Sequence, residues 1–172
     1  MKVAKTVRHK ILNHASIFDE TIRVYNEALS FIIEVIDSEV SNTNVYSIKE
    51  MTNVVERLIH ATKSNPTPKY AEFNQRFYKF PSYFRRAAIA MAFGKVKSYR
   101  SLLENWETEK QVALENGRKF NKQPPTKQFT HKEFPVLYKG NMFKRTSDTT
   151  ACIKAFVKND WIWVDVVFRP QD

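Results

Sequence analysis

Glycine is scarce in this chain of 172 residues, where it occurs only as Gly94, Gly117 and Gly140. Phosphate-cradling loops and dinucleotide-binding fingerprints need several closely spaced glycines, so neither motif can be written anywhere in the sequence. We therefore expect no nucleotide cofactor of those kinds, and no other cofactor in this chain.

Cysteine is scarcer still, because Cys152 is the only one. A single cysteine cannot form a disulfide framework, which favours a reducing compartment. The histidines have no partner at metal-site spacing, and Cys152 has no histidine nearby in sequence. Asp148, Asp160 and Asp165 fall on different predicted elements. We expect neither a metal site nor an active site.

Long hydrophobic runs are also missing. No stretch of about 18 apolar residues occurs, and the N-terminal residues alternate charged with apolar side chains instead of forming the apolar region of a signal peptide. The sequence therefore predicts a soluble intracellular protein with no segment inserted in a membrane.

Positive charge is abundant, with a formal net charge of +10, and it is unevenly distributed. Residues 16–60 carry −5, from three basic and eight acidic residues, whereas residues 61–100 carry +8, from nine basic and one acidic. Segregated charge builds a local potential that a polyanion can sense. Nucleic acid is the leading partner class and an anionic membrane surface the second, while an ordinary basic surface is the third interpretation.

Helical periodicity dominates the first two thirds of the chain. It predicts a helix that starts with a cap at Ser16 and Asp19, and a second helix from a capping box at Ser47 and Glu50 to about His60. The predicted apolar stripes are Phe18, Ile22, Tyr25, Leu29, Ile32 and Ile36 in the first helix, and Ile48, Met51, Val55, Leu58 and Ile59 in the second. A short helix is predicted over residues 69–78. A long one begins at Pro81 and extends for about 26 residues, roughly 39 Å, before charge and a glycine end it.

Strand patterns occupy the two ends of the chain. Alternation predicts a strand over residues 2–8, a hairpin that turns at residues 139–141 and a second hairpin that turns near residues 159–160. Residues 121–132 are predicted to be a polar linker. Because consecutive strands tend to be neighbours, we expect the first strand to pair with the later sheet. The predicted class is α+β, with a helical insertion over residues 16–120.

The predicted long helix has three distinct faces. Opposite its apolar core face lie Arg86, Lys97 and Arg100, which flank Phe93. A stripe of small side chains beside them would allow close approach of a nucleic-acid backbone, although packing against another helix explains it equally well. The small residues are Ala87, Ala90, Gly94, Ser98 and Ser101, and the core face comprises Phe84, Ala88, Ala92, Val96, Tyr99, Leu102, Leu103 and Trp106.

Aromatic and basic residues are interleaved at two places. Before the long helix, NQRFYKFPSYFRR sets Arg76 and Lys79 among aromatic rings that either stack on bases or form core. In the last predicted strand, Trp161 and Trp163 share one face with Arg169. That face is either a stacking platform or the wall of a second core layer.

From about Arg76 onward the chain resembles the N-terminal part of TnpB-type proteins, the transposon-encoded RNA-guided nucleases related to type V CRISPR effectors. The resemblance rests on FPSYFRRAAIAMAFGKVKSYRSLLENWE, a following PP, and then FPVLYKGNMFK and IKAFVKNDWIWVDVVF. It implies a wedge domain, a small β-barrel formed by residues 1–15 and 133–172, and a helical recognition domain over residues 16–120.

The resemblance also implies partners, namely a guide RNA and a target DNA with a short adjacent motif, in the bacterial cytoplasm at the nucleoid. No small-molecule substrate is expected. Ser82, Tyr83 and Arg86 match the family's motif-reading residues by position. With the basic and small residues nearby, the predicted DNA contacts are Arg76, Lys79, Ser82, Tyr83, Arg86, Ala90, Lys97 and Arg100. The predicted RNA contacts match the wedge by region alone and are Lys5, Arg8, Lys139, Lys144, Arg145, Trp161 and Trp163.

The sequence departs from the complete family where the nuclease domain would begin. It contains neither the RuvC-type carboxylate motifs nor the zinc-binding cysteines of that domain. We therefore expect a nucleic-acid-binding fragment, either a truncated chain or the product of a remnant gene, without cleavage activity of its own. The alternative is a helical protein-interaction module whose surface is basic incidentally.

Overall fold

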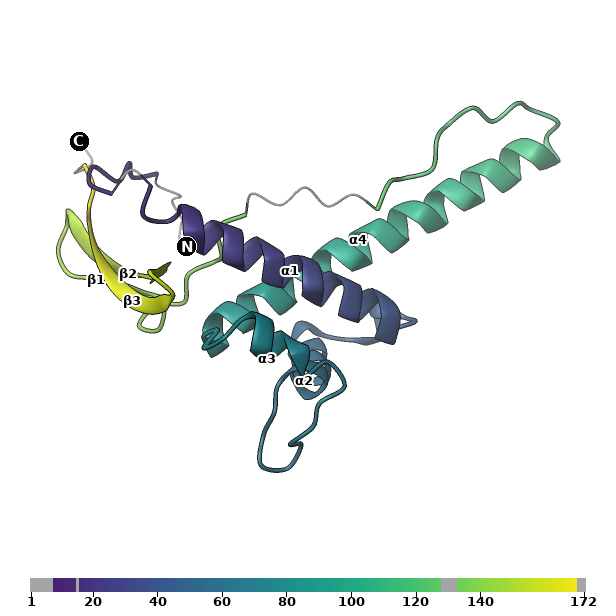
Figure 1. The fold of residues 1–172 in the computed structure, drawn as a ribbon. Helices are drawn as coiled ribbons and strands as arrows, with labels where there is room; N and C mark the ends of the chain where they lie inside the picture. Colours follow the sequence, from purple (N-terminus) through teal and green to yellow (C-terminus); the bar gives the residue numbers. More distant parts are fainter. Residues whose placement is uncertain (1–7, 15, 128–132, 170–172) are drawn as a thin grey trace, which may run out of the picture.

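A computed structural model describes residues 8–14, 16–127 and 133–169 and confirms the α+β class (Figure 1). A helical block comes first and a three-stranded antiparallel sheet follows it. The helices are α1 (Asp19–Glu39), α2 (Ile48–Ile59), α3 (Glu72–Arg76) and α4 (Ser82–Glu115), with a short 3-10 turn η1 (Thr43–Val45) after α1, and the strands are β1 (Phe143–Arg145), β2 (Thr150–Val157) and β3 (Asp160–Val167).

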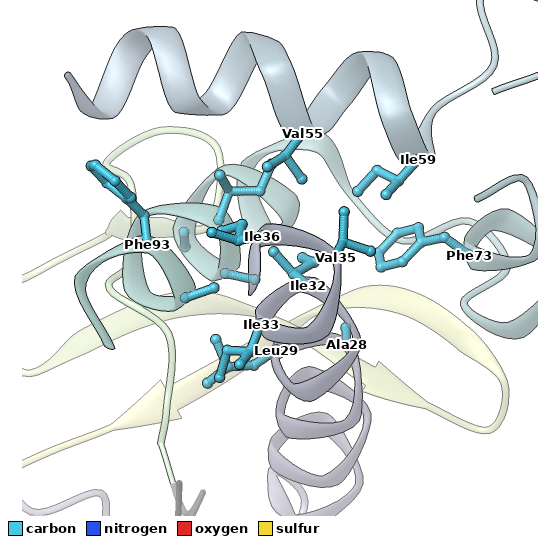
Figure 2. Packing of buried hydrophobic residues seen from close by; sticks show 14 of the residues in the cluster. Ala28, Leu29, Ile32, Ile33, Val35, Ile36, Val55, Ile59, Phe73 and Phe93 are labelled. Atoms are coloured by element: carbon cyan, nitrogen blue, oxygen red, sulfur yellow. The ribbon is translucent and has the colours of Figure 1, made fainter. Parts of the chain in front are cut away.

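Helix α1 supplies the centre of the helical core. Its predicted apolar stripe is confirmed, because Leu29, Ile32 and Ile36 are fully buried. Figure 2 shows residues of α1 surrounded by Val55 of α2 and by side chains of α3 and α4. The predicted cap of this helix is wrong: the cap position is Phe18 and makes no side-chain bond, so Ser16 lies too far upstream.

Helix α2 begins with the predicted capping box, which is confirmed. The Ser47 hydroxyl accepts from the backbone N–H of Glu50 at 3.3 Å, and the Glu50 carboxylate accepts from the backbone N–H of Ser47 at 2.8 Å. Its buried face contains Met51, Val55 and Ile59. Ile48, predicted to belong to that face, is 60% exposed because it occupies the first helical position, ahead of the packed turns.

Helix α3 is shorter than predicted, and α4 is longer. Helix α4 runs over 34 residues, from the residue after Pro81 to Glu115, and so exceeds the predicted length of about 26 residues although a glycine follows its end as predicted. Gly117 has φ +64°, its N–H bonds Leu114 O at 3.0 Å, and Arg118 N–H bonds Ala113 O at 2.8 Å. This pair of bonds is a Schellman motif, which satisfies the last carbonyls of a helix.

The sheet has strand order β1-β2-β3. Lys158 and Asn159 both have positive φ and connect β2 to β3 in a two-residue turn, one residue before the predicted position. The predicted first hairpin is wrong. A turn exists at Gly140, but the residues before it form no strand, because Pro135 lacks an N–H and the Tyr138 carbonyl accepts from the local N–H of Met142 at 2.9 Å.

The described strands do not close into a barrel, so they give no support to the predicted closed form. Residues 2–7 of the predicted first strand lie outside the described residues. The segment after them does run beside β3, because Ile11 forms an antiparallel bridge with Phe168 and Leu12 N–H bonds Val167 O at 2.7 Å.

The chain returns from the far end of α4 towards the sheet along the helices (Figure 1). Trp106 Nε1 donates to Lys122 O at 2.8 Å, and Lys122 also pairs with Glu109 at 2.7 Å. Beyond the undescribed residues, the buried Asn26 of α1 exchanges two hydrogen bonds with the backbone of Glu133, at 3.0 and 3.2 Å. The predicted linker is therefore held against the helices, as far as it is described.

Buried residues form two clusters, one among the helices and one under the sheet. One face of the sheet packs on Ile17 and Phe18 at the start of α1. At its turn end, the other face packs Trp161 against the helical cluster. The assignment of these parts to separate domains stays a prediction.

Candidate nucleic-acid interface

Most of the basic residues in segment 61–100 form ion pairs with acidic residues of the same protein. Six of the nine basic residues there form ion pairs within 4.0 Å, and four of their partners come from the acidic segment 16–60. Among the described residues, the other three, Lys63, Arg86 and Lys97, are in no ion pair within that distance. The six pairs are Lys69–Glu39, Arg76–Glu27, Lys79–Asp160, Arg85–Glu56, Lys95–Glu133 and Arg100–Asp37.

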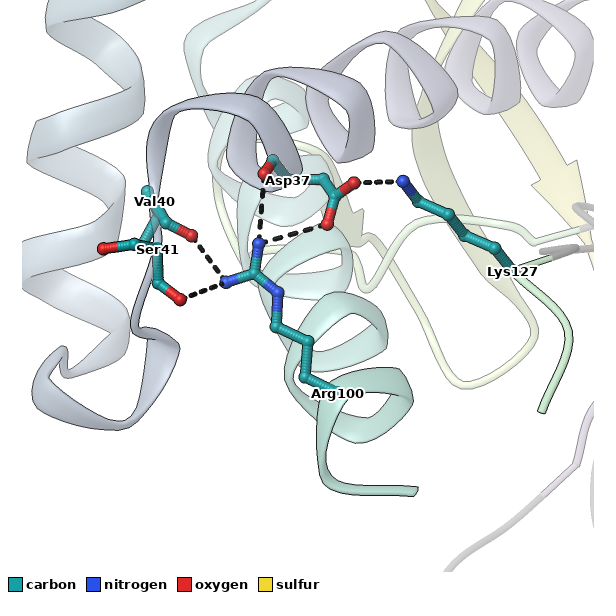
Figure 3. A network of polar contacts seen from close by, with 5 residues as sticks. All are labelled: Asp37, Val40, Ser41, Arg100 and Lys127. Atoms are coloured by element: carbon teal, nitrogen blue, oxygen red, sulfur yellow. Dashed lines mark hydrogen bonds and ion pairs between the residues drawn. The ribbon is translucent and has the colours of Figure 1, made fainter. Parts of the chain in front are cut away.

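Arg100, one of the predicted DNA contacts, makes bonds within the protein (Figure 3). Its guanidinium donates to the carbonyls of Val40 and Ser41 and to the carboxylate of Asp37, the last at 3.1 Å. These bonds satisfy carbonyls at the end of α1. Arg100 thus joins α1 to α4, and its contact with DNA stays a prediction.

We call residues 118–127, which follow α4, the return segment. Its Lys127 forms a second ion pair with Asp37 (Figure 3). Partial burial raises the pKa of Asp37, but the hydrogen bonds from Lys127 and Arg100 outweigh it and hold that pKa below its usual value. The network therefore stabilises the charged carboxylate and links α1, α4 and the return segment.

The faces of α4 change along its length. The predicted core face is buried at Phe84, Ala88, Ala92 and Val96, but Leu102 is 56% exposed, since the helix extends beyond the other helices there (Figure 1). Phe93, predicted beside the basic edge, is buried and lies under Lys97 with 5.9 Å from Nζ to the ring centroid. In the small-residue stripe, Ala87 is buried, Ala90 is half-buried, and Gly94, Ser98 and Ser101 are exposed.

The first turn of α4 brings several predicted contacts together. We call Ser82, Tyr83, Arg86 and Tyr138 the helix-start cluster. The Arg86 guanidinium lies over the Tyr83 ring, 5.1 Å from its centroid, and the Tyr83 ring lies 5.4 Å from that of Tyr138. Ser82, Arg86 and Tyr138 are exposed. The cap residue makes no side-chain hydrogen bond and the first turn holds no acid, so the positive end of the helix dipole is not neutralised.

Arg76 lines a cleft between α1, α3 and the β2–β3 turn, and Lys79 pairs with Asp160 at the end of that turn. Arg76 lies 3.9 Å from Glu27, and Lys79 lies 3.9 Å from Asp160. Both side chains are more than half exposed and both ion pairs are long, so each pair restrains its side chain only weakly. The two cations stay accessible to a ligand, but each has a carboxylate beside it.

The two tryptophans of β3 have different surroundings. The ring of Trp161 packs on Phe80, Phe84 and Phe156, with centroids 5.5, 4.6 and 5.2 Å away, as the core interpretation expects. Its contact with RNA stays a prediction. Trp163 is 37% exposed. The ammonium groups of Lys144 and Lys154 lie 4.4 and 5.7 Å from the centroid of its ring.

We call Lys144, Lys154 and Trp163 the open-face platform. Sequence reasoning missed Lys154, although a two-residue turn at 158–159 places it directly opposite Trp163. A cation over an exposed ring contributes about 0.5–1 kcal/mol, less than the roughly 1–3 kcal/mol of a base stacked on an aromatic side chain. A base can therefore displace these lysines from the ring.

The remaining predicted RNA contacts are scattered. Arg145 donates to the carbonyls of Ser147 and Asp148, which ties it to its own loop. Arg8 and Lys139 are exposed, and Lys5 lies outside the described residues.

Cys152 lies on the sheet beside the platform. Its thiol donates to the Asp165 carboxylate at 2.9 Å, and this hydrogen bond, with partial desolvation, raises the thiol pKa. A raised pKa disfavours the thiolate that a nucleophile needs. In residues 8–14, 16–127 and 133–169, no three His, Cys, Asp or Glu side chains gather as a metal site would require.

The helices of the described ranges include none with the length and apolar character needed to cross a bilayer. No curated protein and no solved structure matches the chain. Residues 5–157 match the Aq_aa04 family. Since that match covers most of the 172 residues, the protein belongs to the Aq_aa04 family.

Proposed function

We propose that this protein is a nucleic-acid-binding part of a transposon-associated RNA-guided DNA nuclease. In this proposal it binds a guide RNA and reads a short target-adjacent DNA motif, in the bacterial cytoplasm at the nucleoid, and does not cleave DNA itself. The sequence resemblance motivates the proposal, and the helix-start cluster is the observation that carries it.

The helix-start cluster has the chemistry that phosphate and base contacts need. Backbone N–H groups at the start of a helix are free to donate to an anion, and the helix dipole favours negative charge there. Arg86 adds a cation with no described acid within ion-pair distance, and Ser82 adds a hydroxyl. Tyr83 and Tyr138 supply ring faces and phenolic oxygens next to them.

The wedge-like barrel is part of this proposal. The bridge between Ile11 and Phe168 supports it, because the N-terminal segment reaches the edge of β3 that a further strand would occupy. The three described strands would then form part of a larger sheet that residues at the N-terminus extend.

Replacing Arg86 tests the proposal. Arg86→Gln should weaken binding of the whole chain to a randomised 30-base-pair DNA duplex by about tenfold, or ~1.4 kcal/mol, in fluorescence anisotropy. Lys110→Gln is the matched control, because Lys110 is exposed on the same helix and lies 5.0 Å from the ring centroid of Trp106. Unchanged affinity of Arg86→Gln, or an equal loss in the control, would remove the cluster from the proposed interface.

A protein-interaction module is the second candidate, and one observation favours it. The outer part of α4 exposes Leu102, Val112 and Leu114, each more than half accessible. Binding through such side chains should change little with salt, whereas binding to phosphates should weaken steeply as salt rises. Repeating the titrations between 50 and 300 mM salt, about the range in which phosphate contacts are screened, separates the two candidates.

A further inference from the structure

The open-face platform is built by all three strands. Lys154 lies directly opposite Trp163 on the neighbouring strand, and Lys144 lies opposite Cys152, two residues before Lys154 on β2. Residues paired across a sheet point to the same face, as do alternate residues along a strand. The register therefore places both lysines and the indole on one face.

Only part of this face is covered by the helices. Trp161, two residues before Trp163, points to the same side and packs against Phe80 and Phe84. Trp163 lies further from the turn and keeps 37% of its surface exposed. The helical core thus forms a wall at one end of a platform that stays accessible at Trp163.

The position of Lys144 is unusual for a surface lysine. It belongs to β1 and Trp163 to β3, so its side chain extends across β2 to bring Nζ to 4.4 Å from the ring centroid. Lys154 approaches the same ring from the strand between them. Asp165 is the acid on this face, and its carboxylate accepts a hydrogen bond from the thiol of Cys152, which lies opposite it on β2. An exposed indole ring with two lysines over it suits a planar ligand that carries negative charge, because the one acid on this face is already bonded to Cys152.

We propose that the open-face platform binds an unpaired nucleotide of a single-stranded nucleic acid. The base stacks on the indole of Trp163, and Lys144 and Lys154 move from the ring to the flanking phosphates. Bases in a duplex have both faces covered by their neighbours, so the platform selects single strands or splayed loops. This proposal deepens the proposed function and rests on it only in requiring that the chain binds nucleic acid.

The test compares two tryptophans that both lie beneath lysines. Trp163→Ala should weaken binding of the whole chain to a 12-nucleotide oligouridylate by about tenfold, and Trp163→Tyr, which keeps a stacking ring, by about twofold or less. Trp106→Ala is the matched control, since Trp106 lies 5.0 Å from Lys110 Nζ on α4. Oligothymidylate of the same length shows whether RNA and DNA share the site, and a 12-base-pair duplex should be insensitive to Trp163→Ala.

The lysines give an independent readout. Lys144→Gln and Lys154→Gln should each reduce the slope of log affinity against log salt by about 0.7 for single strands, as expected for one phosphate contact. Circular dichroism and the thermal midpoint of each variant show that it is folded.

The outcomes separate this proposal from the proposed function. If Trp163→Ala weakens binding and Arg86→Gln does not, the result supports the platform and removes the helix-start cluster from the interface. If Arg86→Gln weakens binding while Trp163→Ala binds like wild type, the platform proposal is overturned and the proposed function stands. If Trp163→Tyr loses as much as Trp163→Ala, or if the wild type binds neither oligonucleotide, the platform does not bind unpaired nucleotides.

Discussion

At the scale of single residues, the glycine inside α4 and the glycine that follows the helix have opposite roles. Gly94 lies inside the helix and is exposed, and a Cβ built there meets no described atom within 4 Å. Gly117 has φ +64° and ends the helix. The same side chain added at the two positions therefore has opposite effects on backbone energy.

Gly94→Ala should raise the free energy of unfolding by about 1 kcal/mol, because alanine favours the helix interior. Gly117→Ala should lower it by about 1 kcal/mol or more, because an L side chain is strained at positive φ. Urea unfolding of both variants measures the difference. A destabilised Gly94→Ala protein would mean that this turn of α4 does not tolerate a methyl group. If Gly94→Ala is more stable but binds nucleic acid less tightly, the small-residue stripe is itself a contact.

The residue patterns that sequence could predict are local ones. The capping box at Ser47 and the stripe of α1 depend on neighbours three or four positions away, and both follow from spacing. The fate of an arginine depends on distant partners. Arg85 bonds Glu56 and Arg100 bonds Asp37, 29 and 63 residues away in sequence. Charge alone therefore could not separate these structural arginines from the exposed Arg86.

At the scale of elements, the junction of α1, α4 and the return segment depends on one carboxylate. Asp37 holds Arg100 on one side and Lys127 on the other. Its pKa is lowered in the folded protein, so it contributes stability above its unfolded pKa of 3.8, and this contribution is lost as pH falls through the lower folded value.

Asp37→Asn should lower the free energy of unfolding at pH 7 by about 1–2 kcal/mol, because it weakens hydrogen bonds to two cations. The difference from wild type should shrink as the pH falls below about 4, where the wild-type carboxylate also becomes neutral. Thermal melts from pH 7 to pH 2.5, roughly spanning this titration, measure the effect. Glu34→Gln, an exposed position one turn earlier on α1, controls for the loss of a charge. A difference that is constant with pH would show that ionisation of Asp37 is not the cause.

Two element predictions were wrong for different reasons. Helix α4 continues to Glu115 through mostly exposed residues because residues 107–115 include strong helix formers, although their charge suggested an earlier end. The first hairpin lacks one strand because Pro135 has no N–H to donate and the Tyr138 carbonyl accepts from the N–H of Met142 in a local turn. Intrinsic helix propensity decided the first outcome, and local backbone hydrogen bonds decided the second.

At the scale of the whole molecule, the N-terminal segment is hydrogen-bonded to the last strand of the sheet. Asn13 donates through Nδ2 to Asp165 O at 3.0 Å and accepts through Oδ1 from Val167 N–H at 2.8 Å. Its amide thus imitates a strand backbone along the edge of β3. The expected neighbour relation between the N-terminal segment and the last strand is present at these residues.

Asn13→Ala should lower the free energy of unfolding by about 1–2 kcal/mol, since both hydrogen bonds are lost at once. Near-ultraviolet circular dichroism, which senses the tryptophans of β3, should show the loss in the same transition. Asn121→Ala, at an exposed position in the return segment, is the control. An unaltered midpoint for Asn13→Ala would count against a structural role for the N-terminal segment.

The candidate site was partly predictable at this scale. The spacing placed Ser82, Tyr83 and Arg86 together, and the structure adds Tyr138 from 55 residues downstream. Alternation placed Trp161 and Trp163 on one face but did not show that only the first is covered by helices. The edge of that cover depends on how the helical block sits on the sheet, which no local pattern encodes.

Helix α4 also determines how the molecule moves through solvent. At 1.5 Å per residue its 34 residues span about 51 Å, longer than the roughly 40 Å diameter of a compact chain of this length. The free chain should therefore sediment more slowly than a sphere of its mass, with frictional drag that falls when a partner covers the helix.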